Sequence, residues 1–131
     1  MDFHYSSGLS SCDDLFELYD SVDWNRYLQL SKEELEKAVV QSWYVINAYE
    51  KEKLIGTGRV ISDGVINACI CGIVVHPSYQ KRGIGSEIVR RLVDKCREGN
   101  LHIQLFCSED NIAYYKKLGF EVFAVGMMVR R

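Results

Sequence analysis

The stretch IVVHPSYQKRGIG, residues 73–85, decides how this chain folds. It opens with three β-branched residues, 73–75, which predict a strand. Pro77 ends that strand because proline has no N–H to donate to a ladder. A glycine-bearing turn follows, and a helix is predicted from Ser86 to about residue 97, because apolar residues recur there on one face. The stretch therefore predicts a strand, a turn and a helix in direct succession.

This succession is typical of an anion-binding site. The first amides of a helix have no partner inside it, and the helix dipole adds roughly half a positive charge there. Gly83 and Gly85 carry no Cβ, so a ligand can lie against the backbone. Lys81 and Arg82 add positive charge at the mouth of the turn. The turn is expected to bind a phosphate or pyrophosphate; the alternative is a glycine turn that only connects the strand to the helix.

Length, charge and cysteine content narrow the class of protein. The 131 residues are predicted to form a single domain, residues 1–131, that is large enough for a hydrophobic core. The net charge of −2 argues against general binding of nucleic acids. The sequence contains no apolar run near the roughly 18 residues of a membrane span, and residues 1–8 do not resemble a secretory signal. The five cysteines form no CxxC pair, so buried, reduced thiols in a cytoplasmic protein, with no bound metal, are expected.

Hydrophobic periodicity predicts a mixture of helices and strands. Two helices are expected near the N-terminus, at residues 13–20 and from Ser31, which forms a capping box with Glu34. Three antiparallel strands should follow, with an Asp-Gly hairpin turn and a bulge or close backbone approach at Gly72. The strand at 101–107 should run parallel to the third of these strands, because a helix joins the two. The strands are expected at residues 3–5, 44–49, 54–61, 65–75 and 101–107, and the last helix at residues 112–118. Residues 120–123 and 127–130 are expected to form two further strands or one kinked strand.

Two motifs resemble those of the GNAT family of N-acetyltransferases. The family pattern Q/R-x-x-G-x-G/A is matched by Gln80, Gly83 and Gly85, and the pattern F/Y-Y-x-K-x-G-F is matched by residues 114–120, YYKKLGF. The resemblance covers nearly the whole chain. It implies the GNAT fold, an α+β fold with a mixed, mostly antiparallel sheet flanked by helices. The run GRVISDGVINA, residues 58–68, is most similar to a small bacterial and plastid group that includes plant serotonin N-acetyltransferase-like proteins.

The resemblance implies that the acetyl group of acetyl-CoA passes directly to a primary amine, without an acyl-enzyme. Tyr115 would then assist the departing thiolate, unless it is a core residue, as Tyr114 is expected to be. Asn111 either binds pantetheine or caps the last helix, and a backbone N–H near Val74 would stabilise the oxyanion. The residues implied to bind the donor are Ile73, Val74, Val75, Gln80, Lys81, Arg82, Gly83, Ile84, Gly85, Ser86, Asn111 and Tyr115.

Several residues compete for the role of general base. Many relatives place Asp or Glu on the third meander strand, where this chain has Cys71 and Gly72. His76 is proposed as the catalytic base because its intrinsic pKa is suitable. The other candidates are Asp63, Glu109 and a relay of water through backbone carbonyls.

The acceptor pocket is expected between the connection of the two N-terminal helices and the meander. Trp24, Tyr27 and Asp63 are the predicted acceptor-binding residues. The expected partner is a small-molecule amine, with no nucleic acid and no membrane, and the C-terminal strands could also form a homodimer. The alternative function is a catalytically weak acyl-CoA-binding module, or an acetyltransferase that modifies proteins or peptides.

Overall fold

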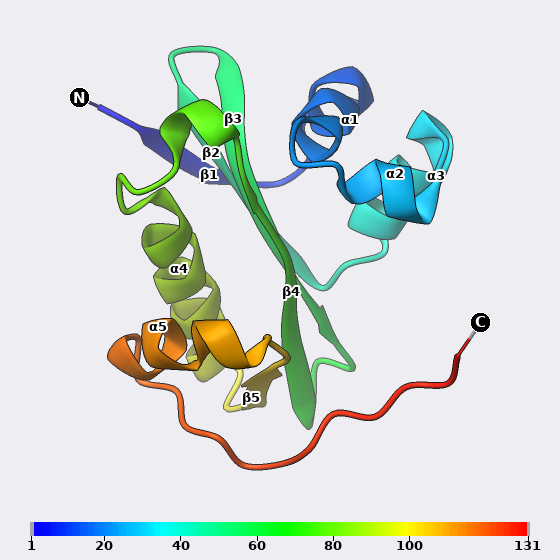
Figure 1. Ribbon diagram of the computed structural model, residues 1–131. Helices are drawn as coiled ribbons and strands as arrows, with labels where there is room; N and C mark the ends of the chain where they lie inside the picture. The colour runs from blue at the N-terminus through cyan, green and yellow to red at the C-terminus, as the bar shows by residue number, and fades with distance from the viewer. Residues whose placement is uncertain (1, 131) are drawn as a thin grey trace.

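The computed structural model describes residues 2–130, in which helices cover both faces of one sheet (Figure 1). The sheet has five strands in the order β1-β2-β3-β4-β5. Neighbouring strands are antiparallel except β4 and β5, which are parallel. The strands are β1 (His4–Ser7), β2 (Tyr44–Glu50), β3 (Lys53–Ser62), β4 (Asn67–Val75) and β5 (His102–Leu105). The helices are α1 (Cys12–Ser21), α2 (Trp24–Leu28), α3 (Lys32–Val40), α4 (Ile84–Glu98) and α5 (Ile112–Lys117), with 3-10 turns at Pro77–Tyr79 and Glu109–Asn111. The mixed, mostly antiparallel sheet flanked by helices confirms the predicted α+β architecture.

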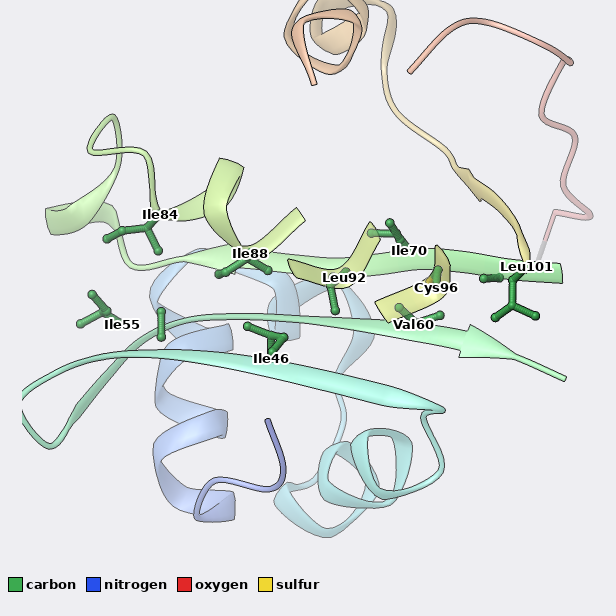
Figure 2. Packing of buried hydrophobic residues seen from close by; sticks show 11 residues of the cluster. Ile46, Ile55, Val60, Ile70, Ile84, Ile88, Leu92, Cys96 and Leu101 are labelled. Atoms are coloured by element: carbon green, nitrogen blue, oxygen red, sulfur yellow. The ribbon is translucent and has the colours of Figure 1, made fainter. Parts of the chain in front are cut away.

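Helix α4 packs on one face of the sheet and forms the larger apolar cluster. Ile84, Ile88, Leu92 and Cys96 lie on one side of the helix and point at the strands (Figure 2). Each of these four side chains is at most 1% exposed, as the helical spacing of the apolar residues predicts. The strands contribute Ile46, Ala48, Ile55, Val60, Ala68 and Ile70, and Leu101 closes the end of the cluster.

The opposite face is covered by α1 and α3. Leu15, Leu18 and Leu35 are buried there against Val45, Leu54 and Val74 of the sheet. The predicted capping box at the start of α3 is confirmed, because Ser31 Oγ accepts from the Glu34 amide and Glu34 accepts from the Ser31 amide.

Helix α2 is absent from the sequence prediction, which has only a polar connection there. It has five residues and begins after Asp23, whose φ is +59°, so it carries no periodic apolar signal. The loop after it is closed by the Asn25 amide, which donates to the Leu30 carbonyl and accepts from the Leu30 N–H.

The two strands predicted at 120–123 and 127–130 are wrong, because the chain has no regular secondary structure from residue 120 to residue 130. Their β-branched and apolar residues favour strands, but a strand needs a partner. The adjacent strand β5 has only four residues, and the tail contacts this region through Phe123 beside His102 and through Phe106 beside Gly126. The outer edge of β5 stays unpaired in the described sheet, so local propensity alone does not make this segment a strand.

Candidate active site

Strands β4 and β5 diverge, and this divergence defines the candidate site. Their pairing runs from Asn67 and His102 to Ile70 and Leu105, where β5 ends. β4 continues to Val75, so its last five residues, 71–75, have no strand partner on the β5 side. An extended ligand can pair with these backbone groups as an added strand would.

A β-bulge marks the point where the two strands separate. Thr57 pairs with Val74 and Arg59 pairs with Cys71, so β4 has one more residue than β3 between these two pairs. Gly72 lies inside it with φ of +63°, a conformation that glycine adopts without strain. The bulge predicted at Gly72 is confirmed.

The turn between β4 and α4 presents uncapped amides. Gly83 is the N-cap residue of α4 with φ of +81°, and no side chain caps the helix. A Cβ at Gly83 would meet nothing within 4 Å, so the space in front of this helix end is open. Lys81 also has a positive φ, +64°. The helix N-terminus therefore offers free N–H donors to an anion, as the sequence predicts.

The remaining residues of the turn contribute in different ways. Gln80 donates from its side chain to the Val75 carbonyl at 3.1 Å, which ties the turn back to β4. The guanidinium of Arg82 lies 5.3 Å from the centre of the Tyr79 ring. Ile84 and Val74 are 1% and 2% exposed, so only their backbone groups can reach a ligand.

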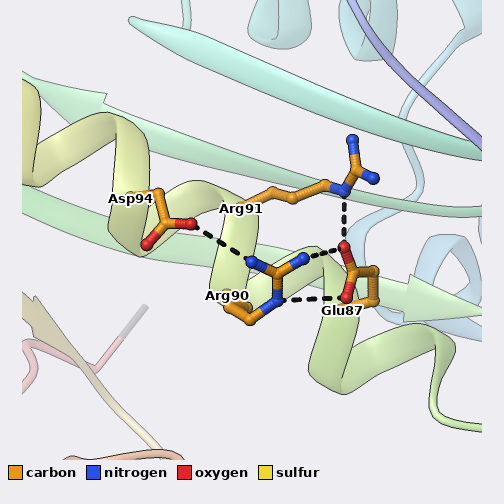
Figure 3. A network of polar contacts seen from close by, with 4 residues as sticks. All are labelled: Glu87, Arg90, Arg91 and Asp94. Carbon is orange, nitrogen blue, oxygen red and sulfur yellow. Dashed lines mark hydrogen bonds and ion pairs between the residues drawn. The ribbon is translucent and has the colours of Figure 1, made fainter.

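Charged residues on the outer side of α4 form a separate network (Figure 3). Glu87 accepts from Arg90 and from Arg91, the latter at 2.7 Å, and Arg90 also contacts Asp94 at 3.3 Å. Hydrogen bonds from Arg90 and Arg91 hold the pKa of Glu87 below its usual value, against the effect of burial. These ion pairs cover the solvent side of the helix, and they involve none of the residues that are predicted to bind the donor.

Helix α5 carries two adjacent tyrosines with different surroundings. The Tyr114 hydroxyl lies 2.8 Å from Ser86 Oγ, and the Tyr114 side chain is 40% exposed, so the expectation of a core residue at 114 is wrong. The Tyr115 ring packs edge-on against Phe120 and lines a cavity of about 370 Å³ between β5, α5 and the C-terminal tail. Burial raises the pKa of the Tyr115 phenol, which keeps it protonated at neutral pH.

Asn111 occupies the N-cap position of α5, but its side chain makes no capping hydrogen bond. The residue is exposed and lies just before the helix that carries Tyr115. Its amide therefore stays available to a ligand.

His76 does not have the geometry of a general base in this structure. Its Nδ1 accepts from the Ser78 N–H at 3.1 Å, so the neutral ring carries its proton on Nε2. No lone pair then remains to take a proton from an amine. The ring instead caps the turn Pro77–Tyr79 and lines a cavity of about 330 Å³ beside α1.

Asp63 is a turn residue, and its hydrogen bonds argue against the predicted roles in acceptor binding and as an alternative base. Its Oδ1 accepts from the amides of Val65, Ile66 and Asn67 at 2.7–3.3 Å. These bonds, led by that from Ile66, lower the pKa of the carboxyl. The residue sits at the far end of β4 from the turn at 80–86, about eight strand residues or on the order of 25 Å away.

The acceptor side is only partly as predicted. Trp24 begins α2, is 44% exposed and meets the Tyr19 ring at 6.4 Å, so it can contact a ligand. The side chain of Tyr27 lies outside the described part of the structure. Arg59 and Tyr19, which face the bulge from β3 and α1, are not among the acceptor-binding residues predicted from the sequence. The signal for Arg59 was a single cation inside the apolar strand LIGTGRVI.

Two further expectations concern thiols and membranes. All five cysteines are unpaired thiols; Cys96 is buried, but Cys107 is exposed and so departs from the expected burial. Among residues 2–130, no group of His, Cys, Asp and Glu is arranged to hold a metal ion. No helix within the same range is both long and apolar enough to cross a bilayer.

Comparison with known proteins identifies the family. The sequence model of the Acetyltransferase (GNAT) family matches residues 9–120. The curated protein "Uncharacterized N-acetyltransferase ycf52" of Pyropia yezoensis is 33% identical over 112 residues, which are 82% of this chain and 63% of that protein. "Histone acetyltransferase TAP1" of Glycine max is 32% identical over 126 residues, 87% of this chain and 53% of that protein. The chain therefore belongs to the GNAT family, and it spans between 53% and 63% of the length of these two relatives.

Solved structures agree with this assignment. The GNAT family protein SP0256 of Streptococcus pneumoniae has a TM-score of 0.83 at 26% identity, over 99% of this chain and 98% of that one. The PaiA N-acetyltransferase of Thermoplasma acidophilum, solved in complex with coenzyme A, has a TM-score of 0.76 at 19% identity, over 96% and 94% of the two chains. The second likeness is one of fold.

Proposed function

We propose that this protein transfers the acetyl group of acetyl-CoA directly to a primary amine within a ternary complex. The observation that carries the proposal is the unpaired edge of β4 at residues 71–75, which leads straight into the uncapped N-terminus of α4. Acetyl-CoA has an extended polar pantetheine arm, which can pair with the strand edge, and a pyrophosphate beyond it, which can bind at the helix N-terminus. Membership in the GNAT family supports the same donor.

The donor would be held mainly by backbone groups. The pantetheine arm pairs with Ile73–Val75, and the pyrophosphate lies against the amides of Gly83, Gly85 and Ser86. Lys81 supplies a positive charge at the mouth of the turn, and Asn111 offers a side-chain amide from the facing helix.

The chemical step needs one bond formed and one broken. The amine nitrogen attacks the thioester carbon, a backbone N–H near Val74 stabilises the oxygen as it gains charge, and the carbon–sulfur bond then breaks. Tyr115 gives its proton to the departing sulfur, which suits a phenol kept protonated by burial. The proton lost by the nitrogen passes to water, since the His76 ring lacks a free lone pair in this arrangement, and water returns a proton to Tyr115.

A protein or peptide acceptor is the second candidate. One relative, 32% identical, is described as a histone acetyltransferase, and this is the observation that favours it. The glycine at 72 leaves no carboxylate on the bulge, and this favours the third candidate, a catalytically weak acyl-CoA-binding module.

The test is release of free thiol from acetyl-CoA with a panel of small amines and of lysine-containing or N-terminal peptides. Tyr115→Phe should lower kcat by roughly 10²- to 10⁴-fold and leave the Kd for acetyl-CoA unchanged. Tyr114→Phe is the matched control: it removes only the hydroxyl that contacts Ser86 and should change kcat far less. Equal losses in the two variants would contradict the role of Tyr115. Binding of acetyl-CoA without release from any amine or peptide would support the binding module instead.

Compartment and assembly stay predictions. Two relatives are described as chloroplastic, so a plastid is the alternative to the predicted cytoplasm. The predicted homodimer would cover the tail, where Val125, Met127 and Val129 are 88–94% exposed. Light scattering at several concentrations tests it.

A further inference from the structure

Arg59 is a cation without a carboxylate partner in the described part of the chain. Its side chain leaves β3 on the face covered by α1, opposite Cys71 in the register with β4. Its Nε is fully buried and has no hydrogen-bond partner. Its Nη1 donates to Ser42 Oγ at a long 3.3 Å. Across residues 2–130, no carboxylate oxygen lies within 4.0 Å of the guanidinium.

A buried guanidinium nitrogen without a partner is costly, because arginine stays charged at any physiological pH and loses its hydration in the fold. The charge acts on its surroundings. It lowers the pKa of the Tyr19 phenol and of the Cys69 and Cys71 thiols, although burial has the larger, opposite effect on each. None of these three groups is negatively charged at neutral pH, so none of them balances the arginine.

The bulge places Gly72 directly against this charge. A Cβ on Gly72 would come within 3.0 Å of both Arg59 Nε and the Tyr19 hydroxyl. A carboxylate side chain at 72 would therefore lie against Arg59 and neutralise it, whereas glycine leaves the buried Nε without a partner. Residues 73–75, which the donor is proposed to contact, follow directly, and Arg59, Cys69 and Cys71 all keep part of their surface exposed.

We infer that Arg59, with the Tyr19 hydroxyl beside it, binds a carboxylate on the acceptor, so that the acceptor is an amine that also carries an acid group, as an amino acid does. The inference rests on the proposed transfer to an amine and names its substrate class. A guanidinium with a free N–H next to a phenol suits a single carboxylate. The same charge repels dications such as polyamines. Trp24, exposed beside Tyr19, offers an apolar wall for the rest of the acceptor.

The first experiment compares amines that differ only by the carboxylate, for example phenylalanine with phenethylamine, and adds phosphoethanolamine as an amine with a phosphate. Binding is measured by calorimetry with free CoA present, and kcat and KM are measured with acetyl-CoA. The acid-bearing amine should bind roughly 10- to 100-fold more tightly, with the difference in KM rather than kcat. Preference for the phosphate-bearing amine over both others would overturn the choice of carboxylate.

The second experiment uses matched variants. Arg59→Met keeps the length of the side chain and removes the charge, so the preference for the acid should disappear, while Arg59→Lys should keep part of it. Gly72→Asp supplies an internal carboxylate and should also remove the preference, whereas Gly72→Asn, of the same size and equally tolerant of positive φ, should keep it. The Gly72 pair keeps the inference testable if Arg59→Met fails to fold.

The outcomes separate this inference from the proposed function. Tight binding of the acid-bearing amine without any acetyl transfer would uphold the subsite and contradict the transferase. Transfer to acid-bearing and neutral amines at equal kcat/KM would overturn the subsite and uphold the transferase. If Arg59→Met lost binding of both amines equally, and Gly72→Asp left the preference for the acid-bearing amine unchanged, Arg59 would have a purely structural role and the inference would be overturned.

Discussion

The two faces of the sheet differ in what their side chains do. On the α4 face the strands present apolar residues or glycine, and the helix lies so close that a Cβ on Gly58 would come within 2.6 Å of Ile88 and 2.7 Å of Ile73. On the α1 face the same strands present Asn47, Thr57 and Arg59. The α4 face is packed with apolar side chains and glycine, whereas the α1 face combines an apolar cluster with the polar groups that border the bulge. The difference shows that the polar groups near the bulge lie on one side of the same strands.

The sharpest test of the packed face is Leu92→Ala. Leu92 is fully buried at the centre of the α4 cluster, so truncation should lower the free energy of unfolding by about 2–5 kcal/mol. Urea denaturation measures this. Val40→Ala, at an exposed position at the end of α3, is the control and should cost less than about 0.5 kcal/mol. Similar costs at the two sites would mean that the α4 face is not the main source of stability.

Gly58→Ala tests how tightly helix and strand approach. The added methyl group has to displace Ile88 or Ile73, and we expect a loss of about 1–3 kcal/mol in the free energy of unfolding. The same change at Gly99, where a Cβ would meet only ordinary contacts of 3.4 Å or more, should leave stability unchanged or slightly raise it. Thermal unfolding of both variants measures these effects. A Gly58→Ala protein as stable as the unsubstituted one would show that the interface is looser than these distances imply.

Thr57→Val tests the polar face. Thr57 Oγ1 donates to Asn47 Oδ1 at 2.8 Å, and both residues are buried, so valine leaves the amide oxygen without a partner. The expected loss is about 1–2 kcal/mol. In an Asn47→Ala background the same substitution should cost clearly less, because no acceptor remains to be orphaned. Strictly additive losses in the double-mutant cycle would refute this coupling.

Glu87→Gln should have the smallest effect, because its ion pairs lie on the solvent side of α4. We expect at most about 1 kcal/mol at pH 7. Arg90 and Arg91 lower the pKa of Glu87 in the folded protein. The stabilisation is therefore complete above the unfolded value of about 4.3 and is lost as the pH falls through the lower, folded pKa. Stability curves of the two proteins should converge as the pH falls through the folded pKa of Glu87, and a gap that persists at still lower pH would contradict this assignment.

The strand, turn and helix that are proposed to hold the donor could be predicted from the sequence, because they follow one another within residues 73–97. The sequence predicts the helix from Ser86, and the structure begins α4 at Ile84, directly after Gly83. The acceptor side could not be predicted in this way. Asp63 and His76 have suitable chemistry, but the structure shows that Asp63 Oδ1 and His76 Nδ1 accept hydrogen bonds from nearby backbone amides. Residue type alone does not show that backbone amides nearby in the sequence donate hydrogen bonds to a side chain.

The sequence by itself determined most elements between residues 12 and 118, though not α2, because these depend on periodicity and on contiguous residues. Its motifs also indicated the GNAT family. Tertiary structure alone decided that the last strands predicted, at 120–123 and 127–130, do not form, since a strand needs backbone pairing that this segment does not make. It also decided that Arg59 of β3, Tyr19 of α1 and Gly72 of β4 meet at one point. These residues are far apart in the chain, and only the register of the sheet and the packing of α1 bring an unbalanced charge beside the bulge.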